Sequence, residues 1–392
     1  MDNNQPQKKG TGPLKGVPDE LVPLYQTLSN WLDQFQQTNQ ERESPADTAP
    51  IFGAHLLAAD SNRGKVLLSP LTKVAVRLLL RRFDRMGVSG ITIVIGYPTL
   101  LPHYDPAGRY LAFYKWVAKA VRQRGMKLLV EHNVLFANSV FSPVKCDFSG
   151  LTFEAFAEEQ QRMAQLVIDA LQPDYLTILH EPQTFTVLAG LDEFRSPELA
   201  THYVESMLSG LRRKGTKVGA GAGNWDSPEY FTRLAKTTVD YLSLHIYNVS
   251  PSGIERAYAV AELGRSVAKP VVLTESWLFK SDGTDAAAET SLSGWEAGFR
   301  RDVFRYWEPL DRRFIENLGC YANSCGVEYV SPFWTDYFFS YVQNRAKARE
   351  LPYFNLINKA VLFPVARALV FGSLTQPGRA YERLCRSSAR EN

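Results

Sequence analysis

The sequence predicts an α/β protein whose strands close into a single (β/α)8 TIM barrel, preceded by an N-terminal extension helix. Two observations support this fold class. Eight short apolar runs alternate with eight amphipathic runs of helical spacing between residues 51 and 371, which is the strand and helix count of such a barrel. The first apolar run leads into Asp60–Gly64 and not into a G-x-G-x-x-G turn, which argues against a doubly wound open sheet.

Four segments follow one another along the chain. Residues 1–18 are polar with scattered Gly and Pro, and we expect them to be disordered. Residues 19–50 comprise a helix and a polar linker, because apolar residues between Leu21 and Phe35 recur at helical spacing. We expect that helix to pack on the outside of the barrel. The catalytic barrel is predicted to span residues 51–375, and residues 376–392 are assigned to a C-terminal tail.

Within the barrel, each apolar run predicts a buried parallel strand and each amphipathic run a helix. The strands are expected at residues 51–58, 90–96, 127–132, 175–180, 217–221, 241–247, 271–275 and 327–333. The helices are expected at residues 71–86, 107–124, 153–171, 197–213, 228–236, 253–266, 293–318 and 353–371. Start signals such as Ser69-Pro70 and terminating glycines such as Gly87 and Gly125 support these boundaries.

Two glutamates directly follow predicted strands four and seven: Glu181 comes after Leu179-His180, and Glu275 after Leu273-Thr274. The C-terminal ends of barrel strands meet at the face where active sites of this fold are built. The chain has six histidines, and four of them fall at predicted strand ends: His55, His132, His180 and His245. The sequence therefore predicts a cleft at this face that is lined by carboxylates and imidazoles.

These residues carry a resemblance to a known superfamily. The order His180-Glu181-Pro182, His245-x-Tyr247, Thr274-Glu275 and Trp334 is similar to that of glycoside hydrolase clan A, whose barrels place an acid/base on strand four and a nucleophile on strand seven. The similarity covers residues 51 to about 371. In one departure, His180 stands where the clan usually has Asn, so an Asn contact with a substrate 2-hydroxyl is not implied.

The resemblance implies a retaining O-glycoside hydrolase that cleaves an oligo- or polysaccharide by double displacement. Glu275 is the expected nucleophile and Glu181 the expected acid/base, with carboxyls about 5–5.5 Å apart. Tyr247 is expected to donate a hydrogen bond to Glu275, and His180 to position the pair. We expect burial and the charge of Glu275 to raise the pKa of Glu181.

Further strand-end residues are candidates for contact with the sugar, through hydrogen bonds or through stacking on indole rings. They are His55, His132, Asn133, Asn224, Trp225, His245, Trp277 and Trp334. Long loops follow predicted strands three, four, seven and eight, and they favour a walled pocket over an open groove. A pocket of this kind is typical of exo action or of oligosaccharide substrates.

Two other functions remain open on the sequence. A metal-dependent barrel hydrolase or isomerase would use His132, His180, His245 and the glutamates as ligands, although strand one lacks a His-x-His pair. A barrel that binds sugar without cleaving it is the second alternative. The glycosidase hypothesis itself predicts no cofactor and no metal.

Composition limits the partners. The net charge of +3 on 392 residues gives no reason to expect nucleic acid or membrane as a partner, so the expected partner is a carbohydrate, and the oligomeric state stays open. The first ten residues carry no signal-peptide core, which fits either a cytoplasmic chain or an exported one shown without its leader. Cys320 and Cys325 are either a disulfide pair or two separate thiols.

Overall fold

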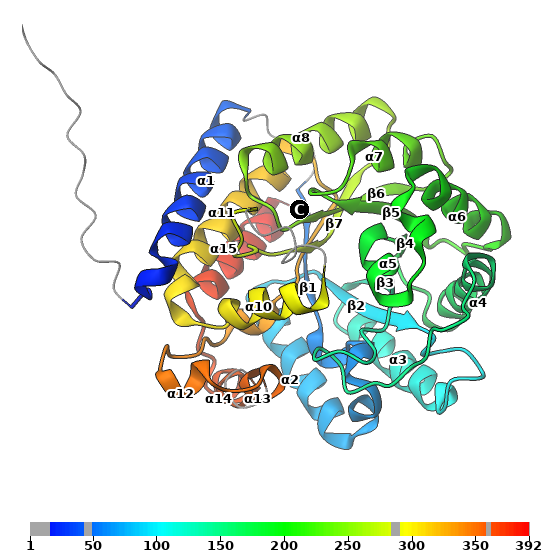
Figure 1. Ribbon diagram of the computed structural model, residues 1–392, viewed down its shortest axis with the longest axis horizontal. Coiled ribbons are helices and arrows are strands. Elements are labelled where there is room, and N and C mark those ends of the chain that lie inside the picture. The colour runs from blue at the N-terminus through cyan, green and yellow to red at the C-terminus, as the bar shows by residue number, and fades with distance from the viewer. Residues whose placement is uncertain (1–15, 43–48, 284–290, 358–361, 392) are drawn as a thin grey trace, which may run out of the picture.

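The structure is a computed structural model that describes residues 16–42, 49–283, 291–357 and 362–391. In it, parallel strands β1 to β8 follow one another around a closed barrel, and β1 pairs with β8. Helices surround this barrel (Figure 1). The predicted fold class, a single (β/α)8 barrel with an N-terminal helix, is confirmed. Most of the segment predicted to be disordered, residues 1–15, lies outside the described residues.

The strands lie where the sequence predicts them, with ends that differ by a few residues. They are β1 (Ile51–His55), β2 (Gly90–Tyr97), β3 (Lys127–Val134), β4 (Tyr175–Leu179), β5 (Lys217–Gly223), β6 (Tyr241–Ile246), β7 (Val271–Ser276) and β8 (Tyr329–Pro332). Nearly every strand residue is buried, because helices cover the outside and side chains fill the inside. This two-sided burial explains why the strands are continuous apolar runs.

The α-helices are more numerous than the sequence predicts. They are α1 (Val22–Glu41), α2 (Pro70–Met86), α3 (Ala107–Arg122), α4 (Phe153–Leu171), α5 (Pro182–Ala189), α6 (Pro197–Gly210), α7 (Pro228–Leu234), α8 (Pro251–Ser266), α10 (Leu292–Asp302), α11 (Glu308–Cys325), α12 (Ala346–Arg349), α13 (Tyr353–Leu356), α14 (Phe363–Phe371) and α15 (Gln376–Glu391). Among the described helices, none combines the length and the apolar character needed to cross a bilayer.

The barrel interior has an apolar, aromatic lower part and a polar upper part. Tyr175, Tyr241 and Tyr329 pack together with Leu129 and Val272 at the lower end. A Cβ at Gly53 or Gly90 would lie within 2.4 Å of the Tyr329 ring, so these glycines leave the space that the ring occupies. Above this layer, polar residues such as Glu131 and His245 face inward. The lower layer thus supports the site from beneath.

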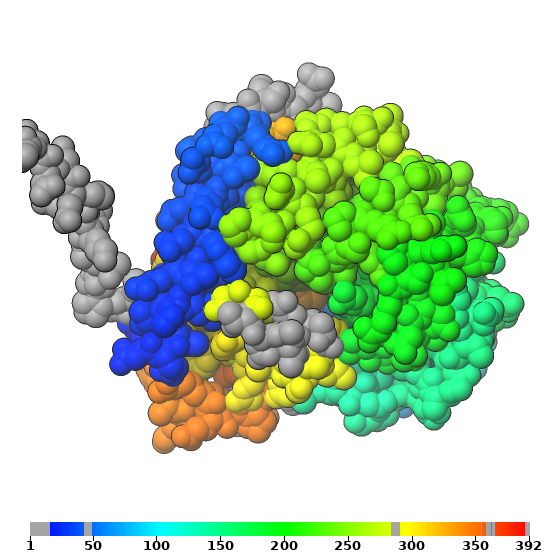
Figure 2. Space-filling model, turned by 45° about the horizontal axis from the view of Figure 1, so that its top comes forward, coloured from blue at the N-terminus to red at the C-terminus, as the bar shows by residue number. Residues whose placement is uncertain are grey.

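Helix α1 packs on the outside of the barrel, as the sequence predicts. It lies against α11 and α8 (Figures 1 and 2), with the face that carries Leu28, Leu32 and Phe35 buried. Its Asn39 amide donates to the Asn317 carbonyl at 3.1 Å and accepts from the Tyr258 hydroxyl at 2.6 Å. The helix therefore covers apolar surface that α8 and α11 would otherwise expose to water.

The C-terminal part differs from the prediction. The sequence assigns the eighth barrel helix to residues 353–371, but this stretch contains the short helices α13 and α14, and residues 358–361 between them lie outside the described part. Helix α15 instead packs between α11 and α2 and closes the ring, although its residues were assigned to a tail. The reason is that α15 carries a narrow apolar stripe, including Ala380, Tyr381 and Cys385, within an Arg-rich sequence.

The two cysteines left open by the sequence lie on α11 and do not form a disulfide. Cys325 is buried in the core, whereas Cys320 is exposed. Burial raises the pKa of the Cys325 thiol to about 11, so this thiol stays protonated at neutral pH. Cys325 therefore acts as a small core residue.

Candidate active site

The two strand-end glutamates share one cavity of about 360 Å³ at the C-terminal ends of the strands. Glu181 follows β4 at the N-terminus of α5, and Glu275 lies within β7. A carboxylate oxygen of each and a ring nitrogen of His245 all lie within 4.8 Å of one another. Residues far apart in the sequence thus form one compact group.

Glu181 is held by two hydrogen bonds. Its Oε1 lies 2.8 Å from Nδ1 of His245, and its Oε2 accepts a hydrogen bond of 2.6 Å from the Thr184 hydroxyl on α5. The side chain keeps 16 % of its surface exposed. Pro182 at the first position of α5 fits a helix that begins directly after this glutamate. The carboxyl is fixed in place while one side of it still faces the cavity.

Glu275 is more deeply placed and has different partners. The Tyr247 hydroxyl donates to its Oε2 at 2.9 Å, and Nδ1 of His245 lies 3.6 Å from the same oxygen. Only 8 % of its side-chain surface is exposed. His245 and Glu275 are paired across β6 and β7, so the sheet itself sets their separation. The phenol holds the carboxylate in one orientation.

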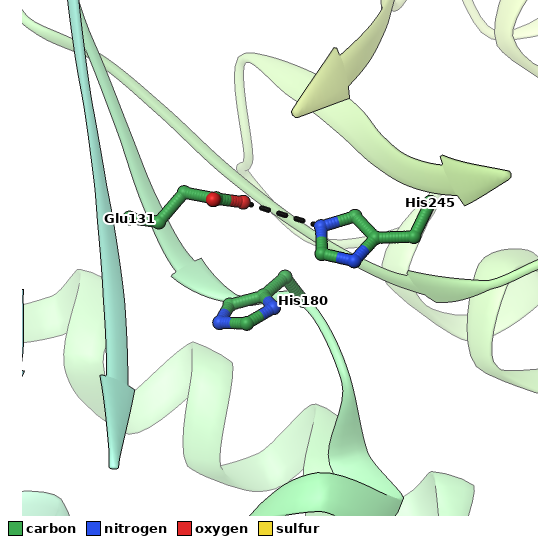
Figure 3. Close-up of side chains that lie close together, drawn as sticks. All are labelled: Glu131, His180 and His245. Carbon is green, nitrogen blue, oxygen red and sulfur yellow. Dashed lines mark hydrogen bonds and ion pairs between the residues drawn. The ribbon is translucent and has the colours of Figure 1, made fainter. Parts of the chain in front are cut away.

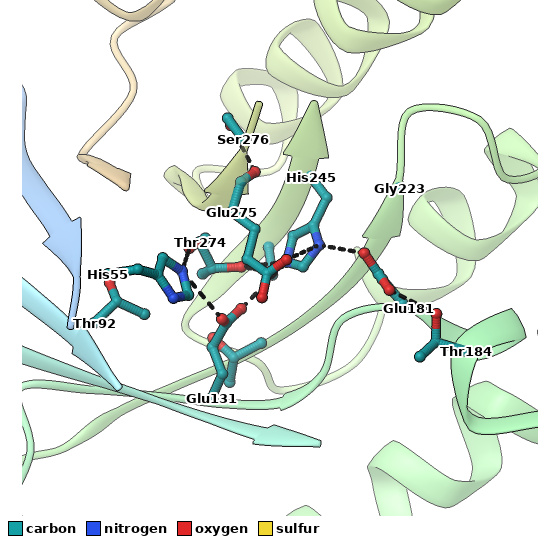
Figure 4. A network of polar contacts seen from close by, with 12 residues as sticks. His55, Thr92, Glu131, Glu181, Thr184, Gly223, His245, Thr274, Glu275 and Ser276 are labelled. Atoms are coloured by element: carbon teal, nitrogen blue, oxygen red, sulfur yellow. Dashed lines mark hydrogen bonds and ion pairs between the residues drawn. The ribbon is translucent and has the colours of Figure 1, made fainter. Parts of the chain in front are cut away.

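His245 connects these carboxylates to a third one, Glu131 on β3. Its Nε2 lies 3.2 Å from Oε1 of Glu131 and 2.8 Å from the Thr274 hydroxyl (Figures 3 and 4). The other Glu131 oxygen lies 3.5 Å from Nε2 of His55, which also contacts the Thr274 carbonyl at 2.8 Å. The sequence did not determine whether the Glu131 side chain points into the barrel. In the structure it does, because side chains alternate along β3 and both Leu129 and Glu131 face the interior.

The charges in this group set its protonation. For His245, burial acts to lower the pKa, but Glu275, Glu131 and Glu181 together raise it well above the usual value. For Glu181, burial acts to raise the pKa, but its hydrogen bond to His245 and the charge of that ring outweigh burial and lower it. For Glu275, burial and the charge of Glu131 raise the pKa well above its usual range.

The expected rise in the pKa of Glu181 is therefore wrong for the substrate-free protein. The physical reason is the contact between Glu181 and the His245 imidazolium, which no spacing in the sequence reveals. The raised pKa belongs instead to Glu275, the deeper carboxyl.

The other three strand-end histidines, His55, His132 and His180, are buried, and burial lowers the pKa of each. The His180 ring stacks on His245 with centroids 4.9 Å apart, beside Glu131 (Figure 3), and its nitrogens make no hydrogen bond within the described residues. On β3, alternation turns His132 outward, away from the cavity. Burial lowers the pKa of His55 to about 4 and that of His132 to about 3. Donor atoms of Glu131, His180 and His245 lie within 4.8 Å of one another and form a candidate metal-ligand set.

The structure divides the predicted sugar-contacting residues into two groups. Asn133, Trp225 and Trp334 line the cavity together with Glu181, Glu275 and Tyr247. The remaining candidates do not line it: His55, His132, His180, Asn224, His245 and Trp277. The Asn224 amide holds the loop after β6 through Asn248 and Gly253, and Trp277 is fully buried against Tyr337 and Phe338.

One part of the cavity was not found in the sequence. Five aromatic side chains line one side of it, and we call them the aromatic wall: Phe136, Phe141, Trp295, Phe299 and Tyr353. They come from the loop after β3, from α10 and from α13. None of these residues directly follows a predicted strand, so nothing in the sequence indicated that they lie at the cavity. The fold brings them together.

The chain was compared with known proteins. No protein-family model matches it, and no curated protein matches it in sequence. Solved structures of similar fold include GH5_18 from Bifidobacterium longum subsp. longum, with a TM-score of 0.56, 13% identity, and coverage of 87% of this chain and 79% of that chain. Another is the exo-beta-1,4-mannosidase Op5Man5 from Opitutaceae bacterium strain TAV5, with a TM-score of 0.53, 15% identity, and coverage of 88% and 60%.

The virulence factor SghA from Agrobacterium tumefaciens is a third, with a TM-score of 0.51, 12% identity, and coverage of 89% of this chain and 98% of that chain. At such identities these likenesses show a shared (β/α)8 barrel. They agree with the fold that the sequence motifs imply.

Proposed function

We propose that this protein is a retaining O-glycoside hydrolase with Glu275 as nucleophile and Glu181 as acid/base. The observation that carries the proposal is the placement of these two carboxylates, from β7 and β4, in one cavity with oxygens within 4.8 Å of each other. Retention requires carboxyls about 5–5.5 Å apart, whereas inversion leaves roughly 6.5–9.5 Å for a water molecule. The short separation supports retention.

The surroundings of each carboxyl support its role. Glu275 receives the Tyr247 hydrogen bond, which stabilises the ionised form that attacks the anomeric carbon. Glu181 keeps an exposed side toward the cavity, from which it reaches the departing oxygen. His245 contacts both carboxylates. Its positive charge offsets the repulsion between these two buried negative charges. We propose a β-linked O-glycoside, or the stereochemically equivalent α-L-arabinofuranoside, as the substrate class.

Double displacement needs an ionised nucleophile and a protonated acid/base when the glycosidic bond breaks. In the free protein, burial and Glu131 raise the pKa of Glu275, whereas His245 lowers that of Glu181, so bound substrate has to reverse this order. Positive charge that develops at the anomeric carbon lies beside Glu275 and stabilises its carboxylate. The substrate thereby favours a proton on Glu181, which passes it to the leaving oxygen. His245 contacts both carboxyls and links them.

The proposal is tested with Glu181→Gln and Glu275→Gln on a panel of nitrophenyl glycosides and polysaccharides. Each variant should lose about 10³-fold or more in kcat/KM on the substrate that the wild-type protein cleaves. Glu229→Gln, at an exposed glutamate on α7, is the matched control and should retain activity. A fully active Glu275→Gln enzyme contradicts the proposal, and a wild type that binds sugars but cleaves none favours the non-catalytic alternative.

A metal-dependent barrel hydrolase is the second candidate, and the cluster of Glu131, His180 and His245 favours it. The unengaged nitrogens of His180 suit a ligand role. However, His245 already contacts carboxylates with both nitrogens, so a metal would have to displace one of these contacts. Metal analysis of the purified protein separates the candidates, since stoichiometric Zn, Mn or Fe with chelator-sensitive activity would replace the glycosidase proposal.

A further inference from the structure

The cavity that contains Glu181 and Glu275 is lined mostly by apolar side chains. Besides the two glutamates, the polar lining residues are Asp60, Asn62, Arg63, Asn133, Gln183, Thr184, Tyr247, Asn248 and Asp336. The remaining lining includes the aromatic wall and several aliphatic side chains, among them Leu57, Val66, Val140, Val187, Ile357 and Leu362. The cavity therefore offers more apolar surface than a sugar ring would use alongside its hydrogen bonds.

The aromatic wall is continuous and held by ring-to-ring packing. Phe136 contacts Trp295 with centroids 6.0 Å apart, and Phe141 contacts Phe299 at 5.6 Å and Tyr353 at 5.2 Å. These edge and tilted contacts are favourable geometries for aromatic rings. The wall joins the loop after β3 to α10 and α13, so it is part of the packed structure and does not depend on a ligand.

The aliphatic residues distinguish between two kinds of occupant. A sugar ring carries a hydroxyl on most of its carbons, and each buried hydroxyl needs a hydrogen-bond partner. An indole or phenyl ring can stack on a sugar, but Leu, Val and Ile offer it no polar partner. A chain of methylene groups needs none and gains affinity from every group removed from water.

The apolar lining also extends to the protein surface. Val66 and Val140 line the cavity, yet they are 49% and 41% exposed. Large exposed apolar side chains at the mouth of a cavity are typical of a site that receives an apolar ligand. An occupant can thus continue from the glutamates along the apolar side and out to solvent.

We propose that the leaving group of the substrate is an alkyl or acyl-bearing chain, so that the substrate is a glycolipid and not an oligosaccharide. This inference rests on the proposed glycosidase function and names the aglycone side of the same site. The sugar lies next to Glu181 and Glu275, and the chain lies along the aromatic wall between Val140 and Ile357.

The test uses n-alkyl glycosides from methyl to nonyl below their micelle concentrations, with the sugar that the nitrophenyl panel identifies. We expect kcat/KM to rise with chain length, by up to about fourfold per methylene over the buried part of the chain. A flat series, or a preference for an oligosaccharide of the same sugar over its nonyl glycoside, overturns the inference while the glycosidase proposal stands.

Binding gives an independent measurement that does not need turnover. Calorimetric titration of the wild-type protein with the n-alkyl β-D-glucosides should show a Kd that falls as the chain lengthens. If binding depends on chain length but the protein cleaves no glycoside, the glycosidase proposal fails and the apolar site stands. If neither rate nor Kd depends on chain length, the apolar site is refuted.

Matched variants locate the effect. Val140→Asp places a charge on the apolar path, and it should flatten the dependence of Kd on chain length. Val267→Asp, at a valine of similar exposure, 38%, near the end of α8 and outside the cavity lining, should leave it unchanged. An unchanged dependence in Val140→Asp, or an equal loss in both variants, contradicts the placement of the chain.

Discussion

At the scale of single residues, the central feature is one imidazole among three carboxylates. His245 contacts Glu181, Glu131 and Glu275 within 2.8–3.6 Å, and these carboxylates outweigh the effect of burial on the pKa of its ring. The sequence predicted the strand-end positions of Glu181 and Glu275, because a carboxylate that follows an apolar run can be recognised from the sequence alone. It did not predict the direction of the pKa shift at Glu181, which depends on a contact across β4 and β6.

Replacement of Tyr247 by Phe tests how Glu275 is held. The hydrogen bond stabilises the carboxylate, so its loss should raise the pKa of Glu275 further. Activity that needs ionised Glu275 falls as the pH drops through this pKa, and the acidic limb of the kcat/KM profile should therefore move to higher pH. We also expect a decrease of about 10- to 100-fold at the optimum, in line with roughly 1.5–3 kcal/mol for a hydrogen bond to a charged group.

The control is Tyr230→Phe, which removes a hydroxyl that donates to the Phe194 carbonyl away from the glutamates. Its acidic limb should stay in place. An acidic limb at the same pH in Tyr247→Phe and wild type would show that this hydrogen bond does not influence Glu275.

Glu131→Gln should have the opposite effect on the pH profile. The negative charge of Glu131 raises the pKa of Glu275, and the neutral amide removes that charge. The pKa of His245 stays raised because Glu181 and Glu275 remain beside it. The acidic limb should therefore move to lower pH, as measured by kcat/KM between about pH 4 and 8. A shift to higher pH would mean that Glu131 acts mainly through His245.

At the scale of elements, the site depends on loops that the barrel strands hold in place. The strands were predictable because they are apolar on both sides. The short helix α5 was not predicted. The sequence predicted one helix at residues 293–318, where the structure has α10 and α11 separated by residues 303–307, and a Pro at the start of α11 fits this break. The sequence also did not reveal which strand side chains face the cavity. His132 and Asn133 are adjacent on β3, yet only Asn133 lines the cavity. The pairing of β3 with the neighbouring strands determines which of its side chains point inward.

The loop after β7 is anchored by a buried lysine. Lys280 has no exposed side-chain surface, and its ammonium donates to Asp311 at 2.6 Å and to the Leu278 carbonyl at 2.9 Å. Lys280→Met leaves the carboxylates of Asp302 and Asp311 without their cation. We expect a loss of about 3–5 kcal/mol in the free energy of unfolding, measured by urea denaturation.

Lys214→Met is the matched control, because Lys214 pairs with Asp169 at the protein surface. Surface pairs contribute little, since water and salt screen them, so its urea midpoint should stay close to that of the wild type. Equal midpoints in the two variants would contradict the anchoring role of Lys280.

At the scale of the whole molecule, α15 completes the ring of helices around the barrel. Its Tyr381 hydroxyl donates to the Gly53 carbonyl on β1 and lies 3.3 Å from the Val330 carbonyl on β8. The last helix thus bridges the seam where the first and last strands meet. The fold class followed from the number of strands. The sequence did not identify α15 as the helix that completes the ring, because the run at residues 363–371 is more apolar and predicts that helix instead.

Tyr381 provides a test of this closure. Tyr381→Phe should cost about 0.5–1.5 kcal/mol for the lost hydrogen bond. Tyr381→Ala also removes a buried ring and should cost about 3–5 kcal/mol. Both are measured as changes in the free energy of unfolding. A Tyr381→Ala protein as stable as Tyr381→Phe would show that α15 is dispensable for the barrel.

The most direct test of the central claim, double displacement by Glu275 and Glu181, is the stereochemistry of azide rescue. Glu275→Ala and Glu181→Ala are each incubated with azide and an activated aryl glycoside, and the glycosyl azide is analysed by NMR. Azide that replaces Glu275 attacks once and should give the inverted product, whereas azide in Glu181→Ala attacks the glycosyl-enzyme and should give the retained product. The same configuration from both variants, or no rescue in either, would contradict the assignment.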